Sequence, residues 1–295
     1  MDLSILIVNW NVRPLIERCL DSIFHETKNL KFEVIVVDND SRDGSVELLK
    51  RRFGNKIKLI INKHNAGFAR ANNQALTLAS GEFILYLNPD TELRSNALLR
   101  AVDYMRQNKN CGALGCRLVD IDGSIQPSVR KFPTLSSQVL ILLKLHHLFL
   151  RLKILREYFQ YDFDYHKLQE VDQVMGAFLM TRMEIIKKIG SFDENFFLWF
   201  EEVDFCRRVK RADYQVIYDP DVQIVHFGHQ SFCQVLSYSK QYHYNRSMIY
   251  FFKKYYPQCQ VCTLLLIQPI SLILAKLIQT IRSPWLKSNK YINSR

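Results

Sequence analysis

Glycine is scarce in this sequence, with 10 among 295 residues, and the glycine-rich nucleotide motifs are missing. Neither GxGxxG nor GxxxxGKS/T opens an expected helix, which argues against a dinucleotide site and against a P-loop. Internal repeats, low-complexity segments and zinc-finger, RNP-like or helix-turn-helix patterns are also absent. The formal net charge of +11 is therefore expected to serve a partner other than nucleic acid.

Cysteine usage and the N-terminal residues both indicate a reducing compartment. The seven cysteines are an odd number and lie mostly within apolar or helical patterns, which is typical of reduced thiols. The sequence begins MDLSILIVNW, where an acidic residue leads directly into an expected strand and no signal peptide is visible. We therefore expect the catalytic part to face the cytoplasm.

Apolar runs alternate with helical patterns through the N-terminal half. The runs read LSILIVNW at 3–10, VIVVDNDSRDGS at 34–45 and IKLIIN at 57–62, and a fourth run, FILYL, precedes Asn88. Between the last two runs, apolar residues recur at helical spacing until Gly81. Four strands alternating with helices of about a dozen residues predict an α/β fold with a parallel sheet and right-handed crossovers.

The fourth run leads into a turn formed by Asn88, Pro89 and Asp90. Parallel sheets place functional groups at the carboxyl ends of their strands. A hard divalent cation prefers oxygen ligands and substrate phosphates, so Asp90 is a candidate for clamping a nucleoside diphosphate. The alternative is an ordinary turn that caps the following helix near Ser95.

Six sequence blocks carry a resemblance to a known family. In order, they are IVNWN, VVDNDSRDGS, NAGFARANN, LNPDTEL, GSFDENFFLWFEEVDFCRR and VHFGHQS. Their order and separations resemble the inverting glycosyltransferases of family two, and within them the rhamnosyltransferase-like branch. The resemblance covers roughly residues 3–232. It implies a GT-A type fold, a Rossmann-like and mostly parallel sheet flanked by helices, and sugar transfer from a nucleotide donor.

The resemblance also implies a divalent cation, Mg²⁺ or Mn²⁺. The metal turn of the family is usually Asp-x-Asp, whereas here Asn88 holds the first position. An amide is a poor ligand beside a carboxylate, so Asp90 is expected to coordinate the cation and Asn88 to bond the donor sugar or ribose. His226, at the end of IVH, matches the histidine that completes the metal site. The alternative for His226 is an ordinary hydrogen-bonded histidine at a strand end.

By the same resemblance, the nucleotide lies over the first two strands. Asp38 matches the position that accepts a hydrogen bond from the pyrimidine ring, and the backbone around Val8 and Asn9 approaches the same base. We expect a dTDP- or UDP-sugar, and the branch favours L-rhamnose carried by dTDP. The remaining candidates for donor binding are Asn65, Gly67 and either Asn73 or Asn72.

Three carboxylates in FFLWFEEVDFCRR are candidates for the general base. Family members usually read Glu-Asp at the first two positions, with the second residue as base, so the role carries over to Glu202. Glu201 and Asp204 are secondary candidates. Mutual repulsion among the three should raise at least one pKa toward neutral pH. The alternative is that these acidic residues only interact with the positive end of a helix dipole.

Two basic, leucine-rich segments, 139–159 and 251–287, predict contact with an anionic membrane surface. The alternative is that they are core helices with charged edges. The run 261–281 is about long enough to span a bilayer, for which roughly 20 residues are needed. A helix that lies in the interface is favoured by a stripe of small and polar residues: Gln268, Ser271, Ala275 and Gln279.

These observations predict one catalytic domain, 1–235, with a basic apolar insertion at about 134–170, followed by a helical membrane-associated tail at 236–295. The enzyme would extend a lipid-linked or cell-surface glycan at the cytoplasmic face of the membrane, as a peripheral protein. A sugar nucleotidyltransferase is one alternative, although it would normally open with a glycine-rich triphosphate loop. A non-enzymatic membrane or nucleic-acid adaptor is another, and it would leave the carboxylates and His226 without a purpose.

Overall fold

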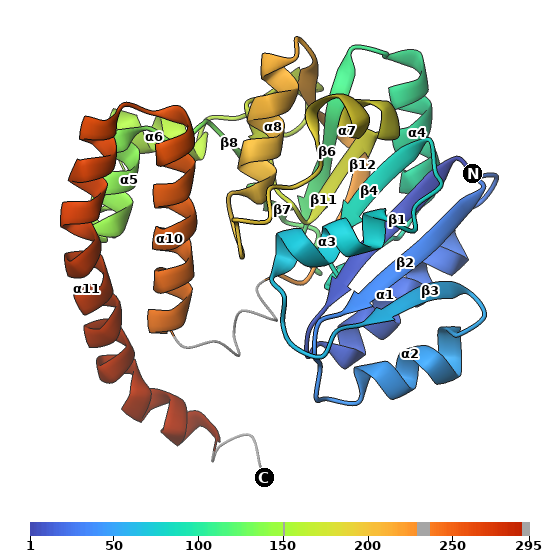
Figure 1. Ribbon diagram of the computed structural model, residues 1–295, viewed down its shortest axis with the longest axis horizontal. Coiled ribbons are helices and arrows are strands. Elements are labelled where there is room, and N and C mark those ends of the chain that lie inside the picture. The colour runs from blue at the N-terminus through green and yellow to red at the C-terminus, as the bar shows by residue number, and fades with distance from the viewer. Residues whose placement is uncertain (150, 229–236, 291–295) are drawn as a thin grey trace. The chain divides into compact units, whose positions relative to one another are not determined.

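Strands and helices alternate along most of the chain (Figure 1). The computed structural model describes residues 1–149, 151–228 and 237–290, with side chains in the last helix up to residue 281. The strands are β1 (Leu3–Asn9), β2 (Phe32–Asp38), β3 (Ile57–Ile61), β4 (Phe83–Leu87), β5 (Thr91–Glu92), β6 (Cys111–Val119), β7 (Ile125–Gln126), β8 (Val129–Arg130), β9 (Gln169–Glu170), β10 (Gln173–Val174), β11 (Phe178–Arg182) and β12 (Gln215–His226). The helices are α1 (Arg13–Glu26), α2 (Ser45–Phe53), α3 (Phe68–Leu76), α4 (Ala97–Gln107), α5 (Leu135–Leu142), η1 (Leu145–His147), α6 (Lys153–Phe159), α7 (Met183–Ile189), α8 (Glu201–Arg211), α10 (Ser237–Tyr255) and α11 (Gln258–Lys290).

The central sheet has the strand order β3-β2-β1-β4-β11-β6-β12-β5. Strands β3, β2, β1 and β4 pair in parallel, whereas β11 runs antiparallel to both β4 and β6. Two antiparallel steps restore the original direction, and β12 is parallel to β6, so β12 runs the same way as β1. The predicted α/β class with a mostly parallel sheet is confirmed. The carboxyl ends of β1, β2, β4 and β12 consequently lie at one edge.

Helices cover both faces of this sheet, and its central strands are therefore buried on both sides. All seven residues of β1 are buried, which is typical of a central strand in a parallel sheet. Successive side chains point to opposite faces. Ile5 and Ile7 pack with α1, α2 and α4, whereas Leu6 and Val8 pack with α3, α7 and α8. Figure 1 accordingly shows α1 and α3 on opposite faces of the sheet.

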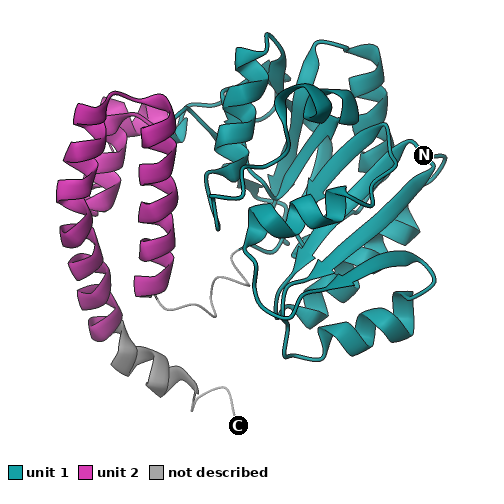
Figure 2. Ribbon diagram, in the orientation of Figure 1, with its two compact units in different colours: residues 1–132, 159–231 teal, residues 133–158, 232–295 magenta. Residues whose placement is uncertain are grey.

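The chain divides into two compact units (Figure 2). Residues 1–132 and 159–231 form the sheet-containing unit, and residues 133–158 and 232–295 form a helical unit. The sequence-based division assigned the whole insertion of about 134–170 to the catalytic domain. In the structure, residues 133–158 instead group with the C-terminal helices, because α5 packs against α11. The predicted boundary at 235 lies outside the described residues.

Within the helical unit, α11 has one packed side and one exposed apolar side. Ser271 and Ala275 are buried, and Gln279 accepts a hydrogen bond from the backbone N–H of Tyr238 at the start of α10. The predicted stripe of small and polar residues is therefore the side that faces the rest of the unit, where small side chains allow close packing. The opposite side exposes Leu266 (78%) and Ile273 (59%).

Among the described residues, one helical segment, Gln258–Ile281, is long and apolar enough to cross a membrane, and an 18-residue stretch of it has a mean hydropathy of 2.2. This finding concerns only the length and composition of the helix. The part of the predicted segment 251–287 that follows residue 281 has no described side chains.

Candidate functional site

The carboxyl ends of β1 and β2 bring the predicted nucleotide residues together. Asn9 and Asp38 pair across the two strands, and Asn9 Nδ2 donates a 2.8 Å hydrogen bond to Asp38 Oδ2. The other oxygen of Asp38 accepts a hydrogen bond from the backbone N–H of Ser41 at 2.9 Å. Both residues are fully buried, and Val8 immediately precedes Asn9 on β1. The carboxylate is thus fixed in orientation at the edge where β2 ends.

Asn39, which was not a predicted site residue, organises the loop next to this pair. Its Oδ1 accepts hydrogen bonds from Asn62 Nδ2 and from the backbone N–H of Ala66. Its Nδ2 donates to Asn65 Oδ1 at 2.9 Å and to the carbonyl of Gly67 at 3.3 Å. Asn65 and Gly67 therefore shape the loop before α3 through bonds to a buried amide. The second residue of the DND tripeptide was the only sequence signal for this role.

Gly67 allows a close contact between the loop and residues that precede α8. Its φ is +87°, and the backbone N–H of Phe68 donates a 2.7 Å hydrogen bond to the carbonyl of Phe197. A Cβ atom on Gly67 would lie 2.6 Å from that carbonyl oxygen and 2.8 Å from Phe197 Cδ2. The absence of a side chain on Gly67 thus allows the loop before α3 to contact the segment that precedes the candidate base.

We expect Gly67→Ala to lower the free energy of unfolding by about 2–4 kcal/mol, because left-handed strain and a backbone clash act together. Denaturant unfolding measures the change. Gly123→Ala is the matched control, since Gly123 has φ +88° but nothing within 4 Å of its Cβ position. It should lose only the strain part, about 1 kcal/mol. Equal losses in the two variants would contradict the proposed contact.

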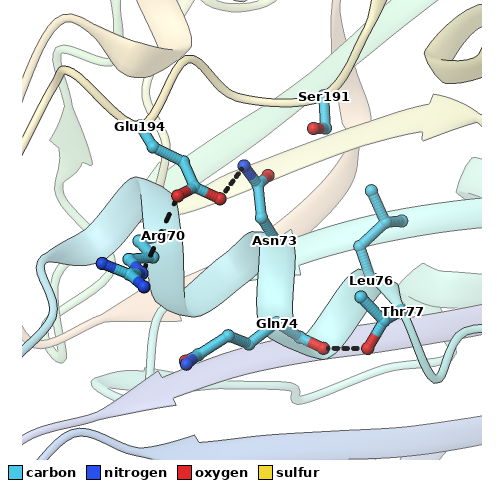
Figure 3. A pocket seen from close by; sticks show the side chains of 7 residues that line it. All are labelled: Arg70, Asn73, Gln74, Leu76, Thr77, Ser191 and Glu194. Carbon is cyan, nitrogen blue, oxygen red and sulfur yellow. Dashed lines mark hydrogen bonds and ion pairs between the residues drawn. The ribbon is translucent and has the colours of Figure 1, made fainter.

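Asn73 lies on the outer side of α3 and bonds to the loop after α7. Its Nδ2 donates to the carbonyl of Phe192 at 2.8 Å and to Glu194 Oε1 at 3.1 Å. Asn73, Glu194 and Arg70 line a hollow of about 550 Å³. Figure 3 shows the side chains of Asn73 and Arg70 pointing toward Glu194. The amide of Asn73 thus connects α3 to this loop. Its neighbour Asn72 is buried, and Asn72 Nδ2 bonds the carbonyl of Phe68.

The structure places Asp90 and His226 next to each other. His226 pairs with Thr91 across β12 and β5, and the backbone N–H of Phe227 donates to the carbonyl of Asp90 at 2.8 Å. These backbone bonds bring Asp90 Oδ1 within 3.5 Å of His226 Nε2. Both residues are about 5% exposed, at 6% and 5% respectively. Asn88 begins the same turn, and its side chain is half-buried.

This pair suits a small divalent cation whose coordination is completed by oxygen atoms of a substrate. Neighbouring ligands of such an ion lie about 3.0–3.4 Å apart when metal–ligand bonds are roughly 2.1 Å long. The observed 3.5 Å is close to that spacing. Within the described ranges, no group of three or more histidine, cysteine or acidic side chains gathers for a metal. A cation that is bound largely through substrate phosphates needs only one or two ligands from the protein.

Glu201 and Glu202 begin α8 after two residues in the left-handed region. Trp199 and Phe200 have φ of +63° and +71°, a strained conformation that is retained where the surrounding structure holds it in place. Glu202 lies against Gly176, whose Cβ position is 3.7 Å from Glu202 Cβ. The next residue, Ala177, accepts a 3.0 Å hydrogen bond from the backbone N–H of Asn88. Glu202 therefore lies beside the segment at residues 176–177, which bonds the turn that carries Asn88 and Asp90.

Burial, more than repulsion, sets the protonation of the two glutamates. Oε2 of Glu201 and Oε2 of Glu202 are buried and accept no hydrogen bond from the described residues. Burial raises the pKa of Glu202 to about 7, while the backbone N–H groups of Glu202, Val203 and Phe200 act to lower it. Burial and, after it, the charge of Glu202 raise the pKa of Glu201 well above its usual range. The expected rise is present, but its first cause is desolvation.

Asp204 is fully buried and has a partner of opposite charge. Its Oδ2 accepts a 2.7 Å hydrogen bond from Arg208 Nε. The remaining nitrogens of Arg208 donate to the carbonyls of Ile189, Gly190 and Ser191. Asp204 therefore orients an arginine that holds the loop before the strained segment. The spacing of four residues between Asp204 and Arg208 on a helix was the available sequence signal.

The comparison with known sequences decides the family. The profile described as Glycosyl transferase family 2 matches residues 4–190. The chain belongs to this family. The match confirms that the protein is a glycosyltransferase, and it sets aside the nucleotidyltransferase and the non-enzymatic adaptor.

Two relatives of this family 2 glycosyltransferase carry informative names. The N-acetylglucosaminyl-diphospho-decaprenol L-rhamnosyltransferase of Mycobacterium tuberculosis is 26% identical over 239 residues, which are 76% of this chain and 75% of the relative. The rhamnosyltransferase WbbL of Escherichia coli is 26% identical over 197 residues, or 64% and 71% of the two chains. These similarities confirm the rhamnosyltransferase-like branch.

Solved structures agree on the fold. The mannosyltransferase PcManGT from Pyrobaculum calidifontis, in complex with GDP-Man and Mn²⁺, has a TM-score of 0.58 at 19% identity and covers 96% of this chain and 75% of its own. GalNAc-T7, solved with UDP, GalNAc and Mn²⁺, has a TM-score of 0.57 at 14% identity and covers 77% and 44%. The family 2 glycosyltransferase described here therefore has the predicted GT-A type of fold.

Proposed function

We propose that this enzyme is an inverting transferase that moves L-rhamnose from a dTDP-sugar onto a lipid-linked glycan acceptor. One observation supports the reaction type above others, namely a carboxylate, Glu202, with an unpaired oxygen and a pKa of about 7 beside the loop that bonds the metal turn. The sugar and the acceptor class are suggested by the names of the mycobacterial and Escherichia coli relatives. A UDP-sugar is the alternative donor.

Inversion needs a single displacement at the anomeric carbon. An acceptor hydroxyl oxygen forms a bond to this carbon as the bond to the diphosphate oxygen breaks, and the diphosphate leaves with the bonding electron pair. Glu202 takes the proton of the hydroxyl, a role suited to a base whose pKa lies near the working pH. In this proposal no enzyme nucleophile is required, because the acceptor attacks directly.

The donor is proposed to lie along the shared edge of β1, β2 and β4. Asp38, held by Asn9, would accept a hydrogen bond from the pyrimidine ring, and Asn88 would bond the sugar or ribose. Asp90 and His226 would hold a divalent cation, Mg²⁺ or Mn²⁺, because Asp90 Oδ1 and His226 Nε2 are buried ligand atoms 3.5 Å apart. When bound, the cation neutralises charge that develops on the leaving diphosphate.

A donor panel tests this proposal. The purified full chain is supplied with dTDP-rhamnose, UDP-sugars and GDP-sugars, with membrane lipid extract as acceptor, and release of nucleoside diphosphate is measured. We expect the fastest acceptor-dependent release from dTDP-rhamnose. Because donor choice depends on a few pocket contacts, a different best donor would overturn the sugar assignment and leave the glycosyltransferase family intact. Release without acceptor would indicate hydrolysis only.

We propose further that the helical unit binds an anionic membrane surface at the cytoplasmic face. The exposed side of α11 carries Leu266, Ile270, Ile273, Leu277 and Ile281, each at least 49% exposed, and Lys276 is the only charged residue of the helix between Gln258 and Ile281. Exposed apolar residues also occur between η1 and α6, where Leu148 is 75% exposed. An exposed apolar side on a basic protein favours an interfacial helix.

The double change Leu266→Glu with Ile273→Glu should lower affinity for anionic vesicles by about 10²-fold or more, because two apolar contacts with the bilayer would be replaced by charges of the same sign as the lipid headgroups. Vesicle sedimentation measures the change. Leu78→Glu is the matched control, since Leu78 is 42% exposed and lies two residues after α3, in the other unit. Unchanged sedimentation of the double variant would exclude this side of α11 as the anchor.

A further inference from the structure

Gln126 makes three hydrogen bonds at the end of the β6–β7 hairpin. Its Nε2 lies 2.6 Å from Asp120 Oδ1 and 2.7 Å from the carbonyl oxygen of His226. A carboxylate and a carbonyl only accept hydrogen bonds. The amide nitrogen of Gln126 must therefore face these two oxygens, since the reverse orientation would place three acceptors together. The orientation of this amide is fixed by its partners.

The fixed amide determines the tautomer of His226. Gln126 Oε1 lies 2.8 Å from His226 Nδ1, and an amide oxygen only accepts. Nδ1 therefore carries a proton, and in the tautomer whose single ring proton lies on Nδ1, Nε2 has a lone pair. This lone pair faces Asp90 Oδ1 at 3.5 Å, and both groups are buried. Two buried acceptors that face each other are stable when a cation lies between them.

We propose that Gln126 is a positioning residue that holds His226 as the Nδ1–H tautomer and presents Nε2 to the cation of the donor site. This inference rests on the proposed cation site. Metal-binding histidines generally donate their other ring N–H to a fixed acceptor, and losing that acceptor costs about 10–100-fold in metal affinity. Gln126 supplies the acceptor from a residue 100 positions away in the sequence.

Asp120 supports Gln126 from the same hairpin. Its backbone N–H donates to the carbonyl of Ser124 at 2.8 Å, and its Oδ2 accepts from Ser124 Oγ at 3.2 Å. Strand β7 pairs with β6, which in turn pairs with β12, so the hairpin is joined to the strand that carries His226. Only an amide can donate to two oxygens and accept from the ring at once.

The test uses Gln126→Leu, with Gln126→Glu as the conservative variant. Two quantities are measured on the full chain: the affinity for Mn²⁺ in the presence of dTDP, and the ¹⁵N spectrum of the His226 ring without metal. We expect Gln126→Leu to lose about 10–100-fold in Mn²⁺ affinity and to lose the single Nδ1–H form. Gln126→Glu should keep the Nδ1–H form, because one carboxyl oxygen still accepts from Nδ1 while the other, as a protonated O–H, donates to Asp120 in place of the amide nitrogen.

Gln223→Leu is the matched control, because Gln223 is exposed on β12 three residues before His226. It should change neither quantity. His226→Ala assigns the ring signals and reports on the cation site itself. Equal Mn²⁺ affinity of wild type and His226→Ala would overturn the cation site. If His226→Ala loses Mn²⁺ affinity as expected, but Gln126→Leu changes neither the ring spectrum nor the Mn²⁺ affinity, only the role of Gln126 is overturned.

Discussion

Glu202→Gln is expected to lower turnover by about 10²- to 10⁴-fold, the usual contribution of a general base, while donor binding stays close to wild type. In the proposed mechanism the base contacts the acceptor hydroxyl and the diphosphate is held by other residues, so the change should affect turnover without affecting donor binding. Glutamine has nearly the same shape and adds no charge to a buried position. Single-turnover transfer and titration with the nucleoside diphosphate measure the two effects.

Neighbouring carboxylates provide the controls. Asp204→Asn breaks the ion pair with Arg208 and should lower stability along with activity, because Arg208 holds the loop at residues 189–191. Glu201→Gln should leave turnover within about tenfold, since the raised pKa of Glu201 already keeps a proton on it. If Glu201→Gln abolishes turnover with donor affinity intact and Glu202→Gln does not, the base is Glu201.

The pH dependence follows from the raised pKa of Glu202. Its ionised form is the base, so turnover should rise as pH increases through about 7 and then level off. The free energy of unfolding should change with pH in the opposite direction to turnover. The folded-state pKa of about 7 exceeds the usual 4.5, so the folded state binds more protons, and the unfolding free energy falls between these values as pH rises. Glu202→Gln should make this fall smaller.

The second large effect is expected from Asp90→Ala. Loss of the carboxylate should reduce turnover by about 10³-fold, because a cation contributes several kcal/mol at the developing charge of the leaving diphosphate. Unlike Glu202→Gln, this change should also weaken binding of the nucleoside diphosphate, and added Mg²⁺ or Mn²⁺ should restore little. His226→Ala is expected to act in the same direction.

Asp103→Ala is a suitable control, because Asp103 lies on α4 and its side chain is 49% exposed. It should keep wild-type turnover and thermal stability. Full turnover of the wild type in excess chelator would rule out the cation, whereas metal-dependent turnover that survives Asp90→Ala would move the cation to other ligands. Thermal unfolding of each variant separates loss of chemistry from loss of fold.

Much of the fold could be predicted from the sequence, because its signals are local. The alternation of apolar runs and helical patterns in the first 87 residues corresponds to β1, α1, β2, α2, β3, α3 and β4. The reversed strand β11 could not be placed, since strand direction within a sheet depends on pairing between distant segments. The grouping of residues 133–158 with the C-terminal helices could not be predicted either, since it depends on packing between α5 and the distant α11.

The candidate site divides in a similar way. The motifs LNPDTEL and VHFGHQS indicated Asp90 and His226, and the pairing of β12 with β5 brings them to 3.5 Å. Neither Asn39 nor Gln126 could be recognised, because an amide has no characteristic spacing until its partners are known. The pKa of Glu202 was expected to rise through repulsion, whereas desolvation is its first cause, and burial is a property of packing.

By itself, the sequence determined the order of the first elements and the family, and it supplied the candidates for the reactive side chains, since periodicity and motif order are written along the chain. Tertiary structure alone decided the contacts between remote residues. The ion pair that makes Asp204 structural, the unpaired burial that raises the pKa of Glu202 and the amide that fixes the ring of His226 are all of this kind. Their energies depend on distance, orientation and solvent exclusion, which exist only after the strands have paired and the helices have packed.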